Sequence, residues 1–236
     1  MTKVSKKIKY ITFPIAIFRA FPKDSIKNVC YLAIQYTFYA ENAKGHSLES
    51  IATFYGFNSI SPDVIKVGKD LFDEFGHSVP MVSVKLDLVM DFYHNPKTDF
   101  EIATFLAFCG LRSILGKKSY CKTNNELLLA RMAGYGTYRQ FVEVKVGVPY
   151  FIENFSTPQK IRYQLTEKII NNELCLRWGL IYYSKNTKGF YVSFKMGLVN
   201  LMVIAENNRK SNKLKEQKAR RAKAYTEALD IISKQK

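Results

Sequence analysis

The chain contains two copies of one pattern of helix starts and stops, and this internal repeat limits the folds it can adopt. The segment that begins Pro22-Lys-Asp-Ser aligns without a gap on the segment that begins Pro96-Lys-Thr-Asp, 74 residues later. Both continue with apolar residues at helical spacing. Because the residues that start and end helices match, and the apolar periodicity matches too, we expect a duplicated unit.

In the first copy the sequence predicts an extended segment over 9–18 and then three helices. The first helix begins with Asp24 or Ser25 as its N-cap. A short second helix begins at Ser47 and ends at Gly56. The third helix begins at Ser61-Pro62, because proline is favoured in the first helical turn.

The second copy follows the same plan and adds a hairpin. An alternating segment over 81–89 is followed by a long helix, by a short helix from Asn125 and by a third helix from Thr157. That helix leads into a strand, a turn over 185–189 and a returning strand over 190–194. The turn contains asparagine and glycine, which hairpin loops favour.

Three helices followed by a β-hairpin is the element order of a winged helix, and over roughly 10–196 the chain resembles winged-helix DNA-binding proteins. The duplication is similar to that of two-domain replication initiators of plasmids and phages. This resemblance implies a mainly helical α+β fold of tandem winged-helix units (helix-turn-helix plus β-hairpin), with a basic C-terminal helix or tail. The expected divisions are 1–80, 81–205 and 206–236.

One departure from that pattern leaves the recognition helix open. About twenty residues separate Gly134 from Thr157, where a helix-turn-helix has a tight turn. The recognition helix is therefore either 157–170 or 137–145.

The formal net charge of +16 is unevenly distributed. Residues 1–100 carry 12 basic and 10 acidic side chains, residues 101–205 carry 14 and 6, and residues 206–236 carry 10 and 4. This asymmetry favours an anionic partner that binds the C-terminal half. Solvated lysine faces without a partner are the alternative interpretation.

Candidate DNA-binding residues lie on the helix from Thr157, in the hairpin turn and in the tail. With Ile161, Leu165 and Ile169 in the core, an α-helix turns its polar residues outward, where glutamine and arginine can contact bases and lysine can reach phosphates. A solvated helix face is the alternative. The candidates are Gln159, Lys160, Arg162, Tyr163, Gln164, Lys185 and Lys188, with Arg139 on the other possible recognition helix and Lys213, Lys218, Arg220 and Arg221 in the tail.

The third helix of the first copy has the opposite charge balance. Its acidic residues, Asp63, Asp70, Asp73 and Glu74, outnumber Lys66 and Lys69 and would repel phosphate. We therefore expect the near-neutral first unit to pack, to form a homodimer or to bind a protein partner.

Catalytic motifs are missing from the sequence. It contains no G-x-x-x-x-G-K-[ST] phosphate loop, and His46, His77 and His94 lie apart from one another. Cys30 and Cys109 fall in apolar helical patterns and are expected in the core. We expect neither enzymatic activity nor a cofactor, structural metal or membrane span, and a cytoplasmic location.

These observations favour a double-stranded DNA-binding protein, either like a replication initiator or a transcription regulator of a mobile element. The alternative is a non-catalytic structural or adaptor protein, in which winged helices contact proteins and the tail binds nucleic acid without sequence specificity.

Overall fold

Two antiparallel sheets and the helices around them make up the described part of the chain, which is mainly helical. The computed structural model describes residues 8–21, 25–75, 79–143, 155, 157–185 and 189–234. In one sheet β1 (Tyr10–Pro14) pairs with β2 (Met81–Lys85). The other has the order β3 (Cys121–Thr123), β5 (Phe190–Ser193) and β4 (Ile181–Tyr183). The predicted α+β class is therefore confirmed.

The helices of the first copy begin at the residues that the sequence indicates. The Ser25 side chain accepts a hydrogen bond from the Asn28 N–H at the start of α1 (Ile26–Asn42). Ser47 caps α2 (Leu48–Tyr55) in the same way, and α2 ends at Gly56 with a left-handed φ of 81°. The third helix, α3 (Pro62–Phe75), begins at the predicted proline.

The first two predicted helices of the second copy have the same lengths as those of the first, whereas α3 has 14 residues and its predicted counterpart spans 158–175. Like α1, α5 (Asp99–Leu115) has 17 residues, and like α2, α6 (Asn125–Met132) has 8. A capping box starts α5, where the Thr98 side chain accepts from the Glu101 N–H and the Glu101 carboxylate accepts from the Thr98 N–H. The equal lengths are what an internal repeat predicts.

The two predicted extended segments are shorter than expected. The first ends at Pro14, where the 3₁₀ helix η1 (Ile15–Ala20) begins. The prediction of a second extended segment over 81–89 is wrong after Lys85, where α4 (Leu86–His94) begins. The physical reason is burial: Leu86, Val89 and Phe92 all face the core at a spacing of three, which is helical.

The strand after α3 does not form a hairpin with a following strand. Instead, β2 pairs with β1, which precedes α1, and α4 comes next. Within the described residues, a hairpin directly after helices therefore occurs in the second copy, as β4 and β5, and not in the first.

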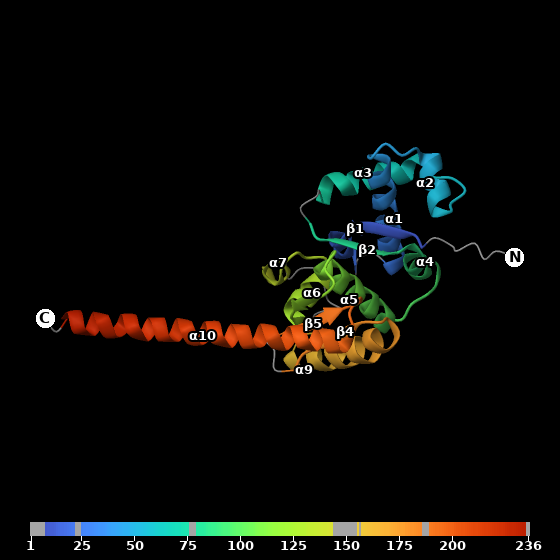
Figure 1. Ribbon diagram of the computed structural model, residues 1–236. Coiled ribbons are helices and arrows are strands. Elements are labelled where there is room, and N and C mark those ends of the chain that lie inside the picture. Colours follow the sequence, from blue (N-terminus) through green and yellow to red (C-terminus); the bar gives the residue numbers. More distant parts are fainter. Residues whose placement is uncertain are drawn as a thin grey trace.

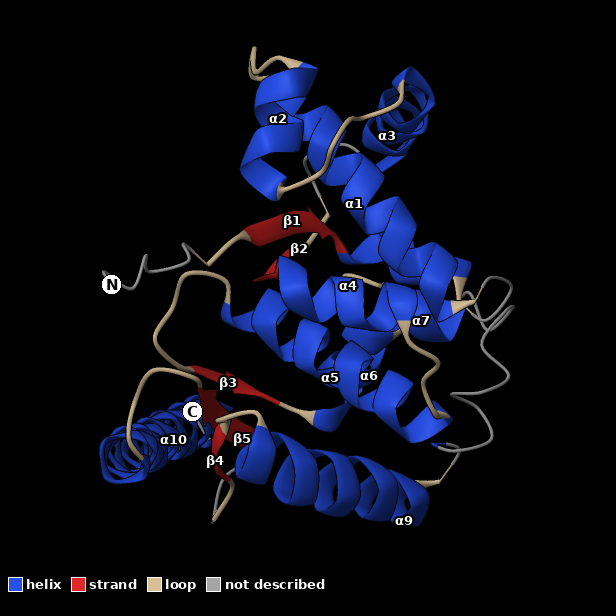
Figure 2. Ribbon diagram, turned by 90° about the vertical axis from the view of Figure 1, so that its right-hand side faces the viewer, coloured by secondary structure: helices blue, strands red, loops and turns tan. Residues whose placement is uncertain are grey.

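One apolar core joins the two copies. The Phe18 ring of η1 lies 6.4 Å from the Phe105 ring of α5, and the Phe92 ring of α4 stacks on Phe105 at 4.3 Å. Cys30 and Cys109 are buried in this core, as predicted, and burial raises the pKa of Cys30 to about 12. The elements form successive layers, with α1–α3 over β1 and β2, then α4–α6, then the second sheet (Figure 2). No described helix is both long and apolar enough to cross a bilayer.

The helices α1 and α3 approach each other closely at Gly68, which is buried. A Cβ atom at this position would lie 2.7 Å from the Tyr39 Cβ and would also meet the Gln35 carbonyl oxygen. Any larger residue therefore forces the two helices apart.

We expect Gly68→Ala to lower the free energy of unfolding by about 1–3 kcal/mol, the usual effect of overpacking. This loss exceeds the gain in helix propensity, which is about 1 kcal/mol. Gly197→Ala, directly before α10, is a control for the added methyl group, because a Cβ there would have no neighbour within 4 Å. Urea unfolding measures both variants, and equal stabilities would contradict the close approach.

Candidate nucleic-acid interface

The C-terminal helix α10 (Leu198–Lys234) is fixed to the second sheet at its root. Leu201 and Ala205 are buried against Tyr191 of β5. The Tyr183 hydroxyl of β4 donates a hydrogen bond to the Glu206 carboxylate at 2.9 Å, and Arg209 pairs with the same carboxylate at 2.6 Å. The hydrogen bonds from Arg209 and then Tyr183 lower the pKa of Glu206. Most of α10 projects away from the body of the protein (Figure 1).

The projecting helix has one strongly basic face. Side chains 210–224 are all exposed. At about 100° per residue, five cations fall within an arc of about 160°. They are Lys210, Lys213, Lys218, Arg220 and Arg221, which we call the α10 basic face, and none of them has an ion-pair partner among the described side chains. Such a row of exposed cations attracts a polyanion.

The predicted helix from Thr157 is α-helical for one turn only. Thr157 accepts a hydrogen bond from the Lys160 N–H at the start of α9 (Pro158–Lys160), and the π-helix η2 (Ile161–Cys175) follows directly. The α-helical prediction is therefore wrong after Lys160. Its core assignment is confirmed for Leu165 and Ile169, which are buried, while Ile161 is half-buried.

The π-helix changes which side chains share the exposed face. In an α-helix, residues five apart point about 140° away from each other, whereas π-helical hydrogen bonding aligns them. Accordingly Arg162 pairs with Glu167 at 3.4 Å, and the Lys168 ammonium lies 4.6 Å from the centre of the Tyr163 ring. Lys168 was not a predicted site residue, since α-helical spacing separates it from Tyr163.

The structure brings together most of the predicted helix residues. Gln159, Lys160, Arg162 and Tyr163 are exposed over the first turns of α9 and η2, while Gln164 is half-buried. We call the four exposed residues together with Lys168 the η2 polar face.

The other predicted residues lie elsewhere. Lys185 is exposed after β4, and Lys188 lies outside the described residues. Arg139 belongs to the six-residue helix α7 (Tyr138–Glu143), where it pairs with Glu143 at 2.7 Å. Because α7 is apart from α9 in both views (Figures 1 and 2), Arg139 does not join the η2 polar face. Lys213, Lys218, Arg220 and Arg221 belong to the α10 basic face.

On α3 every charged side chain is exposed. The acidic residues Asp63, Asp70, Asp73 and Glu74 share the surface with Lys66 and Lys69. Acidic side chains therefore interrupt any cationic surface on this helix.

Metal-binding groups are not found in the described ranges: no cluster of three or more His, Cys, Asp or Glu side chains could hold an ion there. His46 lies 3.8 Å from Glu41, an exposed contact without a further ligand among the described side chains.

Comparisons of the chain with protein-family models, with curated proteins and with solved structures find no match. A proposal about function therefore depends on the residues and surfaces described above.

Replacing Glu206 by glutamine is expected to loosen the root of α10, because Arg209 and Tyr183 lose a charged acceptor. We expect severalfold faster amide hydrogen exchange over 204–212 in Glu206→Gln. Glu216→Gln is the control, since Glu216 is exposed and has no partner among the described side chains.

Acid should act on the unaltered protein in the same direction. Because the pKa of Glu206 is lowered in the folded state, its contribution is present above the ordinary carboxyl pKa and is lost as pH falls through the lowered value. Exchange over 204–212, corrected for the intrinsic effect of pH, should rise in that range. Identical exchange over 204–212 in Glu206→Gln and Glu216→Gln would show that the contact of Glu206 with Tyr183 and Arg209 does not hold α10.

Proposed function

We propose that the protein binds double-stranded DNA through the α10 basic face and the η2 polar face. The observation that carries this proposal is the row of five exposed cations on a helix that leaves the body of the protein. From Lys210 to Arg221 the row covers about 17 Å at a rise of about 1.5 Å per residue. Duplex DNA presents a phosphate charge about every 1.7 Å, so each cation in the row can meet a phosphate.

A nucleic acid fits this surface better than an anionic membrane does. A helix that lies in a bilayer interface needs an apolar face beside its cations. Over 209–223 the only large apolar side chain is Leu214, and it lies within the basic arc.

The η2 polar face supports sequence reading in addition to phosphate contact. Gln159 can make two hydrogen bonds to adenine, and Lys160 can reach guanine or a phosphate. Arg162 can contact a base only if its ion pair with Glu167 breaks when DNA binds. The Tyr163 ring, capped by Lys168, offers a hydroxyl at the surface.

The element order around η2 supports the winged-helix interpretation of the second copy, because the helix is followed by the β4–β5 hairpin. On this basis we propose a cytoplasmic, non-catalytic role like that of a replication initiator or a transcription regulator of a mobile element.

A second function, that of an adaptor, is favoured by one apolar surface. Leu198, Val199, Met202 and Val203 are exposed at the root of α10, and Val199 has 71% of its surface accessible. A cluster of this kind suits a protein contact. In the adaptor, the α10 basic face would hold nucleic acid without sequence preference.

Replacing all five residues of the α10 basic face by glutamine should weaken DNA binding about equally for all sequences. Because the variant can no longer neutralise five phosphates, the slope of log Kd against log salt should fall by about 4.5. Fluorescence anisotropy with a labelled duplex at several salt concentrations measures this slope.

The control is Lys66→Glu with Lys69→Glu on α3, which should leave the affinity nearly unchanged. If this pair weakens binding as strongly as the α10 variant, the first copy contributes to DNA binding and the assignment is wrong.

Sequence reading is tested by selecting bound duplexes from random DNA at two salt concentrations. We expect an enriched motif, and we expect Gln159→Ala with Lys160→Ala to reduce the preference for it over random DNA by about tenfold or more. Asn171→Ala with Asn172→Ala, two exposed residues near the other end of η2, is the matched control. Binding without any enriched motif would favour the adaptor, and no binding would contradict both functions.

A further inference from the structure

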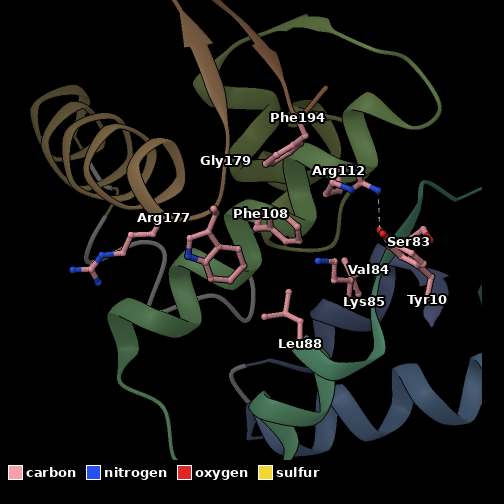
Figure 3. A pocket seen from close by; sticks show the side chains of 11 residues that line it. Tyr10, Ser83, Val84, Lys85, Leu88, Phe108, Arg112, Arg177, Gly179 and Phe194 are labelled. Carbon is pink, nitrogen blue, oxygen red and sulfur yellow. Dashed lines mark hydrogen bonds between the residues drawn. The ribbon is translucent and has the colours of Figure 1, made fainter. Parts of the chain in front are cut away.

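A cavity of about 530 Å³ lies between the β1–β2 sheet, α5 and the residues that follow η2. Its walls come from β2, from α5, from the residues that follow η2 and from Phe194 after β5. Figure 3 shows Phe108 near the middle of this group, with Ser83 and Tyr10 on one side and Arg177 at the opposite margin. This volume is within the range of small-ligand sites.

Aromatic side chains form one wall of the cavity. The Phe108 ring lies 4.9 Å from the Trp178 ring and 5.3 Å from the Phe194 ring. The planes are inclined to one another by 54° and 75°, so the three rings do not stack face to face. An aromatic ring of this wall can stack on the flat face of a planar ligand, as aromatic side chains do on bases.

Two cations, Lys85 and Arg112, also line the cavity, and the Arg112 guanidinium lies 5.8 Å from the centre of the Phe194 ring. Lys85 is exposed, and Arg112 is half-buried with its guanidinium 3.4 Å from the Ser83 carbonyl oxygen. Neither forms an ion pair with a described side chain, and no acidic residue is among those that line the cavity. Arg177 contributes less, because it pairs with Glu173 and its guanidinium points away from the cavity (Figure 3).

The free edge of β2 adds backbone hydrogen-bonding groups. The Leu86 N–H donates to the Lys9 carbonyl, and the Ile15 N–H donates to the Pro80 carbonyl. In this antiparallel register, Val82 and Val84 exchange hydrogen bonds with β1, and the N–H and C=O groups of Ser83 and Lys85 point away from it. The Arg112 bond to the Ser83 carbonyl shows that this edge faces α5.

We propose that this cavity binds a nucleoside phosphate, with the base on the aromatic wall and the phosphate between Lys85 and Arg112. The rings alone would suit any planar apolar molecule, and the cations alone would suit any anion. Their combination, together with an edge of backbone donors and acceptors, selects a ligand that has a flat polar ring and an attached phosphate. The proposal does not depend on duplex binding by α10 or η2.

The chain contains a single tryptophan, Trp178, and it lines the cavity. Its fluorescence therefore reports directly on occupancy. We expect AMP to change this fluorescence in a saturable way with one site per chain, checked by calorimetry. Adenosine and inorganic phosphate, each tested alone, should bind at least tenfold more weakly than AMP.

Lys85→Gln and Arg112→Gln should each weaken AMP binding about tenfold, the usual effect of losing a hydrogen bond to a charged group. Lys118→Gln removes the same charge from an exposed lysine outside the cavity and should leave the affinity unchanged. Urea unfolding verifies that each variant is folded. An equal loss of affinity in Lys118→Gln would show that AMP responds only to the net charge of the protein. Equal binding of adenosine and AMP would show that the phosphate contributes nothing and that apolar contact accounts for the affinity. Either result overturns the proposal.

The nucleotide can be free or can be the end of a nucleic-acid strand. A 5′-phosphorylated pentathymidylate distinguishes these sources when it is compared with AMP in the variant that lacks the α10 basic face. A strand end is identified if the phosphorylated oligonucleotide binds more tightly than both its unphosphorylated form and AMP. A free nucleotide is identified if AMP binds more tightly than both oligonucleotides. If none of these probes changes the fluorescence or the calorimetric heat at millimolar concentration, the proposal is wrong.

Discussion

The stacking of Phe92 on Phe105, with the edge of the Phe18 ring against Phe105, is the contact on which the whole arrangement depends. Phe18 comes from η1 in the first copy, and Phe92 and Phe105 come from α4 and α5 in the second, so these rings join the two copies. Aromatic rings bury large areas, and a core that shares them between two copies makes each copy dependent on the other.

Local signals predict the helix starts well. Ser25, Ser47 and Thr157 act as N-caps because a short polar side chain can bond to a free N–H two or three residues ahead, which the neighbouring residues alone determine. The pairing of β2 with β1 could not be predicted in this way. It joins strands about seventy residues apart, and a five-residue alternation does not specify its partner. The change from strand to helix at Leu86 has the same cause, since burial by distant elements selects the helical face.

The candidate interface could be predicted in part. Exposure of the basic tail residues follows from their composition, and the polar side of the helix from Thr157 follows from the positions of Leu165 and Ile169. The pairs Arg162–Glu167 and Tyr163–Lys168 could not be predicted, because they depend on hydrogen bonding between residues five apart. The cavity could not be predicted for a further reason. Its residues come from distant segments that share no motif, and Trp178 and Phe108 meet only when the chain has folded.

The attachment of α10 to the hairpin has a mechanical consequence. A helix is stiff, and the part beyond Arg209 is about 38 Å long at a rise of about 1.5 Å per residue. This part therefore moves as a rigid rod that pivots at the small group formed by Tyr183, Glu206 and Arg209. A tilt of about 10° at the pivot would carry the far end through about 7 Å, roughly the distance between neighbouring phosphates along one strand of a nucleic acid. Force applied to the tip is delivered to β4, the strand that directly follows η2 and the loop of Trp178.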